Sequence, residues 1–127
     1  MPGMRSLWLV AVGGAIGAVA RATVATTIHS RWPSTLPLGT IIVNISGCLI
    51  LGLLSGVLES RPDVSPVWRA FGAVGVLGAY TTFSTFEFET LSLIERGHLT
   101  AALANVALSL LAGLAAVWAG QAVGRTL

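Results

Sequence analysis

Charged residues are scarce in this sequence: they make up only 9% of its 127 residues. Typical soluble domains carry about 25%. Hydrophobic residues reach 54%, and the mean hydropathy is +0.85. A soluble domain of this length cannot bury so much apolar surface, so the surplus must face lipid. The composition therefore predicts a membrane protein, and no nucleic-acid partner is expected.

Cysteine and histidine are equally scarce. Cys48 is the single cysteine, which excludes an intrachain disulfide and a metal cluster built on cysteine. His29 and His98 lie at the ends of apolar stretches and match no metal-ligand spacing. The sequence also has no ATP-binding motif and no nucleophile–base constellation, so neither a pump nor an enzyme is expected.

The chain does have four long apolar stretches, each long enough for the roughly 20 residues that cross a bilayer as a helix. They are Leu7–Ile28, Leu38–Leu58, Val67–Ile94 and Leu99–Val123. We therefore expect an all-α membrane protein whose residues 1–127 form a single four-helix transmembrane domain. A signal peptide ending near Ala18-Val19-Ala20 is the alternative for the first stretch. It fits less well, because Arg21 continues the span and further apolar stretches follow.

Arginines are distributed almost evenly between the two ends of the predicted bundle. An even number of spans places Arg5, Arg61, Arg69 and Arg125 on one side and Arg31 and Arg96 on the other, with Arg21 deep in the first span. This bias is weak by the standard of the positive-inside rule, so the chain could insert both ways. Such insertion permits an antiparallel dimer of one sequence. A dimer is also the simplest closed assembly for four short helices that must shield a polar path.

Glycines recur at the spacing that is typical of close helix contacts in membranes. The small-xxx-small pairs are Gly13 and Gly17, Gly52 and Gly56, and Gly120 and Gly124, while Gly72, Gly75 and Gly78 recur in the third stretch. Plain helix packing explains most of these glycines.

The third stretch contains a polar, aromatic run from Gly78 to Phe86. Its four hydroxyls and one phenol are costly at membrane depth unless they line a cavity or a pore. A glycine followed by the β-prone residues Tyr80–Thr82 favours a helix broken near the midplane, since a lone strand cannot satisfy its backbone in lipid. The freed carbonyls could hold a cation such as sodium, while half-helix N-termini favour anions.

Phe83 and Phe86 are three residues apart and share a face if the helix resumes there. Ordinary lipid-facing or packing aromatics are the alternative. Their interleaving with Ser84 and Thr85 favours a functional role, because electropositive ring edges together with hydroxyl donors suit a small anion.

Two further polar stripes accompany this run. Thr40, Asn44, Gly47 and Ser55 lie close to one helical face of the second stretch, and Asn105, Ser109 and Gly113 recur every four residues in the fourth. Taken alone, Asn44 could equally join two helices, and Ser109 could bond to its own helix. The stripes and the run together indicate a polar path.

Three charged residues need an explanation at membrane depth. Arg21 either snorkels to the interface or sets a positive potential at a pore mouth. Glu87 and Glu89 follow the hydroxyl run and would repel an anion if both were ionised. We therefore expect them at a wider vestibule, paired with Arg21, or protonated.

Together these motifs resemble the fluoride channel family of bacterial membranes, the Fluc or CrcB-like proteins, over essentially the whole chain. The motifs are Gly13-Gly14-x-x-Gly17-Ala18-x-x-Arg21, Gly39-Thr40-x-x-Val43-Asn44-x-x-Gly47 and Gly78-x-x-Thr81-Thr82-Phe83-Ser84-Thr85-Phe86-x-x-Glu89. The resemblance implies a dual-topology homodimer of the bacterial inner membrane with two antiparallel pores. These pores would conduct fluoride passively, exclude chloride and protect the cell against fluoride toxicity.

The resemblance also implies roles for individual residues. The expected pore and anion-binding residues are Asn44, Tyr80, Phe83, Ser84, Thr85, Phe86 and Ser109. Arg21 and Glu89 would lie near the vestibule, and the backbone carbonyls of Gly78 and Thr81 would hold a structural sodium ion at the dimer centre. The chain departs from the family pattern at Gly113, where a hydroxyl often continues the polar track, and at Glu87, where small polar residues are common.

A different function for the chain is a small dual-topology, proton-coupled exporter of cationic compounds. That class needs a membrane carboxylate, and Glu87 or Glu89 would have to serve. A non-conducting structural subunit held by its glycine faces is a third possibility. It leaves the hydroxyl–phenylalanine run unexplained.

Overall fold

The computed structural model describes residues 6–127, so Arg5 lies outside the described residues. Across that range the chain is helical between short connections, and it contains no strand. Three helices are long and apolar enough to cross a membrane: α1 (Leu7–Arg31), α2 (Leu38–Ser60) and α5 (Leu99–Gly124). The predicted all-helical membrane architecture is confirmed at this level.

Prolines end the first two helices slightly later than predicted. α1 continues past Ile28 to Arg31, and Trp32, which precedes Pro33, leaves the helical region with φ −130° and ψ 71°. α2 ends at Ser60 in the same way, because the next residue precedes Pro62. A residue before proline clashes with the proline ring in the helical conformation, so the helix stops.

The third apolar stretch is divided into three helical pieces. They are the π-helix η2 (Arg69–Leu77), α3 (Gly78–Tyr80) and α4 (Ser84–Glu95). Thr81 is extended, with φ −78° and ψ 158°, so the helix ends at Tyr80 and resumes at Ser84. A π-helix is wider than an α-helix and rare, and it is frequently found at functional sites. After α4, Gly97 adopts the left-handed φ of 83° that a glycine helix terminus uses.

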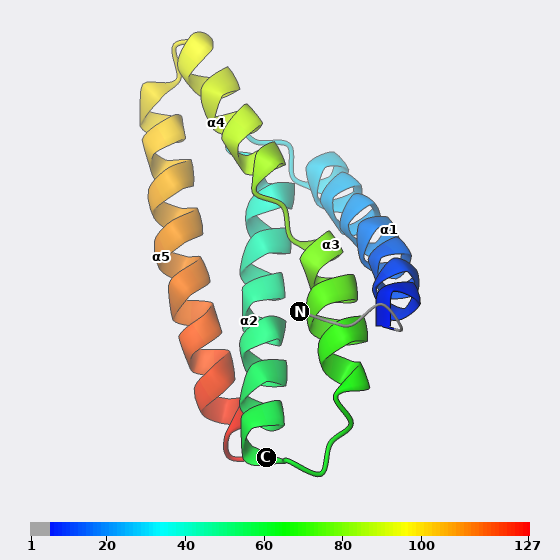
Figure 1. Ribbon diagram of the computed structural model, residues 1–127. Helices are drawn as coiled ribbons and strands as arrows, with labels where there is room; N and C mark the ends of the chain where they lie inside the picture. Colours follow the sequence, from blue (N-terminus) through cyan, green and yellow to red (C-terminus); the bar gives the residue numbers. More distant parts are fainter. Residues whose placement is uncertain (1–5) are drawn as a thin grey trace.

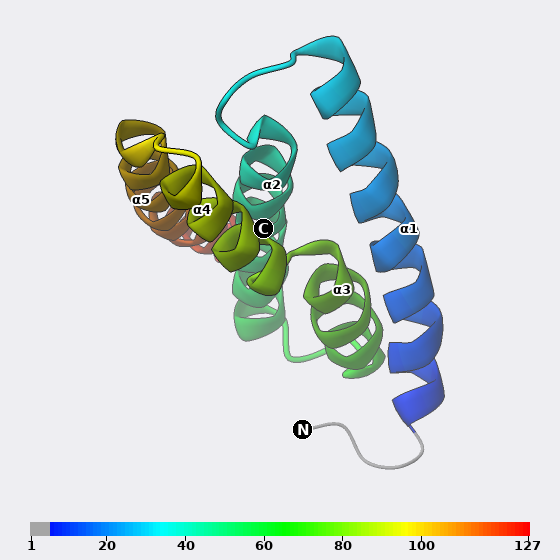
Figure 2. The ribbon, with the colours of Figure 1, turned by 90° about the horizontal axis from the view of Figure 1, so that it is seen from above.

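α2 lies at the centre and contacts every other helical piece (Figure 1). Seen from above, α1 and α5 lie at opposite edges with α2 between them (Figure 2). η2 and α3 pack against α1, whereas α4 packs against α5. The third stretch therefore changes sides, and it does so between Tyr80 and Ser84. We call residues 81–83 the crossover.

Glycines make the helix contacts, as their spacing predicted. An added Cβ on Gly52 would overlap the Val117 carbonyl of α5, and one on Gly120 would overlap the Leu49 carbonyl of α2. On Gly13 the added Cβ would lie 2.5 Å from the Phe71 carbonyl oxygen. Gly14, by contrast, has open space around it. The backbones of α2 and α5, and of α1 and η2, thus approach as closely as small residues permit in lipid.

Large apolar side chains cover the outside of the bundle. Leu114 and Trp118 of α5 are 71% and 72% exposed, and Val19 of α1 is 67% exposed. In a protein with so many apolar residues, this outward-facing surface fits a lipid environment rather than water.

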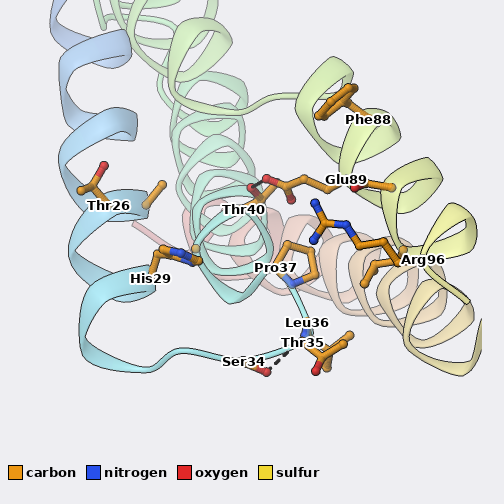
Figure 3. A pocket seen from close by; sticks show the side chains of 14 residues that line it. Thr26, His29, Ser34, Thr35, Leu36, Pro37, Thr40, Phe88, Glu89 and Arg96 are labelled. Atoms are coloured by element: carbon orange, nitrogen blue, oxygen red, sulfur yellow. Dashed lines mark hydrogen bonds between the residues drawn. The ribbon is translucent and has the colours of Figure 1, made fainter. Parts of the chain in front are cut away.

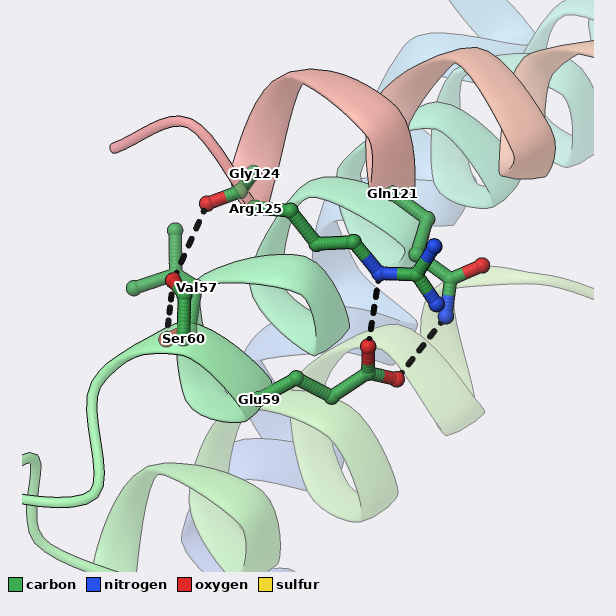
Figure 4. A network of polar contacts seen from close by, with 6 residues as sticks. All are labelled: Val57, Glu59, Ser60, Gln121, Gly124 and Arg125. Carbon is green, nitrogen blue, oxygen red and sulfur yellow. Dashed lines mark hydrogen bonds and ion pairs between the residues drawn. The ribbon is translucent and has the colours of Figure 1, made fainter.

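A polar clasp joins α2 to α5 at the end of the bundle that holds the C-terminus (Figure 4). Arg125 Nε donates to Glu59 Oε2 at 2.8 Å, and Gln121 Nε2 donates to Glu59 Oε1 at 2.8 Å. Both charged side chains are well exposed. The ion pair therefore adds little to the stability of the bundle, although it joins the ends of α2 and α5.

A polar crossover and a cavity beside it

Asn44 of α2 is paired with the crossover backbone. Its Nδ2 donates to the Thr82 carbonyl at 3.0 Å, and its Oδ1 accepts from the Thr82 N–H at 2.8 Å. The side chain thus replaces the partners that the interrupted helix cannot supply. An asparagine amide has two N–H donors, so one of them remains after the pairing.

Tyr80, the last residue of α3, is also attached to α2. Its hydroxyl lies 3.0 Å from Ser46 Oγ, which itself donates to the Val43 carbonyl at 3.1 Å. The phenol is therefore the donor in the Tyr80–Ser46 hydrogen bond. Gly47 makes room for both residues at this point, because an added Cβ would overlap the Thr81 methyl group and lie 3.2 Å from Tyr80 Cδ1.

Arg21 of α1 reaches the crossover from the opposite side. Its Nη1 donates to the Thr81 carbonyl at 3.3 Å. Among residues 6–127 it forms no ion pair with Glu87 or Glu89, so the pairing considered for these residues is wrong. Thr81 in turn donates both its N–H and its hydroxyl to the Leu77 carbonyl, at 3.1 and 3.0 Å.

The phenylalanine pair begins directly after the crossover. The Phe83 and Phe86 ring centroids are 6.0 Å apart and the ring planes are tilted by 42°. Phe86 is buried, with 6% exposed, whereas Phe83 is 72% exposed. Ser84 and Thr85 are exposed as well. Within one copy of the chain, the face that carries Phe83 and the two hydroxyls has nothing packed over it.

A series of hydrogen bonds connects Phe86 to Ser109 across the α4–α5 contact. Thr90 Oγ1 donates to the Phe86 carbonyl at 2.7 Å, and Asn105 Nδ2 donates to Thr90 Oγ1 at 3.0 Å. Ser109 Oγ donates to Asn105 Oδ1 at 3.4 Å. Asn105 is only 1% exposed, so these bonds lie inside the protein.

Sequence reasoning missed two participants in these contacts. Thr90 lies four residues after Phe86 on the same helical face, and this spacing could have indicated it. Ser46 lies off the polar stripe of its helix, so no periodicity pointed to it. Beyond Ser109 the series does not continue through Gly113. An added Cβ there would lie 3.6 Å from the Cys48 sulfur, so a thiol borders this position.

A cavity of about 450 Å³ opens beside α4, near the connection between α1 and α2 (Figure 3). Thr40 Oγ1 donates to Glu89 Oε1 at 2.9 Å, while the buried Glu89 Oε2 has no partner among the described residues. Glu89 therefore lies beside a wide space, where a vestibule was expected. Arg21 does not line this cavity, and Glu87 is exposed.

Known proteins match this chain over nearly its whole length. A family model described as "CrcB-like protein, Camphor Resistance (CrcB)" matches residues 8–121. A protein of Acidobacterium capsulatum named "Fluoride-specific ion channel FluC" is 46% identical over 122 residues, which cover 96% of this chain and 97% of that protein. A Stutzerimonas stutzeri protein of the same name is 44% identical over 122 residues, covering 96% and 98%. One from Solibacter usitatus is 44% identical over 117 residues, covering 92% and 96%.

Proposed function

Because the chain belongs to the CrcB-like family, we propose that it is a passive, fluoride-specific ion channel. The observation that carries this conclusion is the 46% identity, over nearly the full length of both chains, to a protein named as a fluoride-specific ion channel. The protein is a multi-pass protein of a bacterial membrane and not an enzyme. Fluoride enters a cell as neutral HF and dissociates in the cytoplasm, and the channel lets the trapped anion leave down its gradient.

η2, α3 and α4 together form the third of four spans in this proposal, with the crossover near the middle of the membrane. From Arg69 to Glu95 the pieces follow one another with only residues 81–83 outside a helix. At about 1.5 Å per residue this length exceeds the roughly 30 Å of bilayer hydrocarbon. An interruption is tolerated at depth only where its backbone groups find partners. Asn44 supplies partners for both Thr82 groups.

A second copy covers the exposed face of the crossover. Phe83, Ser84 and Thr85 have no neighbour over them in one copy, and hydroxyls beside a broken helix are unfavourable against lipid. An antiparallel homodimer with two pores closes this face with one interface. The weak arginine bias between the two ends permits both orientations. The absence of a second copy in gentle detergent, measured by native mass spectrometry, would contradict this part of the proposal.

Fluoride passes along uncharged donors. It is small and strongly hydrated, so its water must be replaced by many close donors. The remaining Asn44 amide N–H, the hydroxyls of Ser84 and Thr85, and the positive edges of Phe83 and Phe86 can supply them. The Ser109 hydroxyl joins them by giving up its long 3.4 Å contact with Asn105. Tyr80 borders the path, but its proton points to Ser46, so it holds α3 in place. A fixed cation in the narrow part would bind the anion too tightly for rapid exit.

Arg21 and Glu89 lie on either side of this path. Arg21 brings positive charge to the Thr81 carbonyl, where it favours an anion entering the crossover. Glu89 borders the cavity with one oxygen taken by Thr40. We assign the cavity to the vestibule of the channel.

We assign a structural sodium ion to the carbonyls of Gly78 and Thr81. In a continuous helix the Gly78 carbonyl would accept from the Thr82 N–H, which instead donates to Asn44. The Thr81 carbonyl accepts one long contact, 3.3 Å from Arg21, and keeps a lone pair. Neutral carbonyl oxygens are suitable sodium ligands, and a bound cation would offset the aligned carbonyl dipoles. If sodium binds there, replacing it with N-methyl-D-glucamine lowers thermal stability; an unchanged melting temperature would contradict the assignment.

The proton-coupled exporter is the second candidate, and one observation favours it: a partly buried carboxylate, Glu89, lines a cavity. Complementation separates the two functions. A fluoride-sensitive bacterial strain that produces this protein should grow in fluoride and gain no resistance to cationic dyes. Dye resistance that disappears in Glu89→Gln, without fluoride resistance, would favour the exporter.

A further inference from the structure

The cavity beside Glu89 poses an electrostatic problem for an anion channel. Fluoride entering it meets a carboxylate with one oxygen buried and unpartnered. Sequence reasoning offered Arg21 as the compensating charge, but its guanidinium lies at the Thr81 carbonyl, outside the cavity lining. Arg21 therefore does not supply the charge that would offset an ionised Glu89 in this cavity.

Two basic side chains line this cavity: His29 from α1 and Arg96 from the end of α4. Its other lining residues, apart from Glu89, carry no charge. Arg96 extends back along α4, with its guanidinium directed toward Glu89 and Thr40 (Figure 3). The two side chains nevertheless form no ion pair within 4.0 Å among the described residues.

We infer that Arg96 is the countercharge that keeps the cavity from repelling fluoride. This inference rests on the proposed channel function. A guanidinium stays charged at any physiological pH, so its charge in the cavity does not depend on pH. Because Arg96 lines the same cavity as Glu89 and forms no ion pair with it among the described residues, its charge is available to an anion in the cavity. In a cavity with low-dielectric walls, such a charge also raises the local anion concentration.

The size of the effect follows from Coulomb's law. A unit charge about 8–10 Å away in water changes the local concentration of a monovalent anion by about twofold, and more where water is partly excluded. Screening removes nearly all of this effect at about 1 M salt, where the Debye length is about 3 Å, but only about a quarter of it at about 0.01 M, where the Debye length is about 30 Å. Ionic strength therefore distinguishes an electrostatic role from a structural one.

The test measures fluoride conductance of the reconstituted full-length protein at about 0.01 M and 1 M total ionic strength. Arg96→Gln should lower conductance about two- to threefold at the lower ionic strength and leave it near the wild-type value at the higher one. Arg31→Gln is the matched control, since Arg31 is an exposed arginine at the same end of the bundle that does not line the cavity. It should change conductance much less at both ionic strengths.

The double variant Arg96→Gln/Glu89→Gln completes the test. Removing both charges should return the ratio of conductances at low and high ionic strength to the wild-type value, because the amide oxygen introduced by Glu89→Gln can still accept from Thr40. An Arg96→Gln defect that is equal at both ionic strengths, or no defect at all, overturns the inference. A wild-type protein that passes no fluoride would instead overturn the proposed function, so the two failures are distinguishable.

Discussion

Asn44→Ala is the most informative perturbation of the crossover. It removes both hydrogen bonds to Thr82 and leaves a backbone N–H and a carbonyl unpaired. Side-chain hydrogen bonds within membranes contribute on average about 0.6 and at most about 1.7 kcal/mol each. We therefore expect the variant to lose roughly 1–3 kcal/mol of unfolding free energy, with the upper part of the range reflecting unsatisfied backbone groups. Fluoride conduction should fall as well, because the crossover loses its support and the path loses a donor.

The measurement is equilibrium unfolding in mixed micelles, followed by helical circular dichroism, alongside fluoride efflux. Thr27→Ala is the control: its exposed hydroxyl donates to the Thr23 carbonyl of the same helix at 2.7 Å. An Asn44→Ala loss no larger than that of Thr27→Ala would refute the assignment of Asn44 as the support of the crossover.

Three further outcomes follow from the structure. Gly120→Val should lower unfolding free energy by roughly 1–3 kcal/mol because its side chain overlaps the Leu49 carbonyl, whereas Gly14→Val should cost far less; equal losses would contradict the packing. Thr90→Val should cost about 1–2 kcal/mol by leaving the buried Asn105 amide unpaired, and Thr90→Ser should recover most of the loss. Phe83→Ile should slow fluoride efflux roughly three- to tenfold while Phe71→Ile, in η2, leaves it near the wild-type rate; equal rates would remove Phe83 from the path.

Composition and periodicity predicted the helices well, since both depend on local sequence. The long apolar stretches predicted the membrane helices. The glycine spacing indicated the close helix contacts that the structure shows between α2 and α5 and between α1 and η2. Only the ends were displaced, by a few residues at most. Where each helix ends depends on the prolines and glycines that follow it. A hydropathy pattern contains no information about these residues.

Tertiary partners could not be predicted in the same way. The sequence marked Asn44 and the hydroxyl run separately, but their pairing depends on the crossover passing over α2 at that level. For Arg21 a glutamate partner was plausible by charge alone. The structure places it on a carbonyl, because α1 packs against α3 and brings Arg21 to the Thr81 carbonyl. Helix packing decides which of these residues become hydrogen-bond partners. The spacing of residues along one sequence does not reveal that packing.

The most direct test of the central claim is halide efflux from liposomes that contain the purified protein. A fluoride electrode and a chloride electrode record release on matched samples, with valinomycin and a potassium gradient carrying the balancing charge. The account predicts rapid fluoride release with no chloride release above empty liposomes and no need for a pH gradient. Equal release of both halides, or no fluoride release from folded protein, would contradict it.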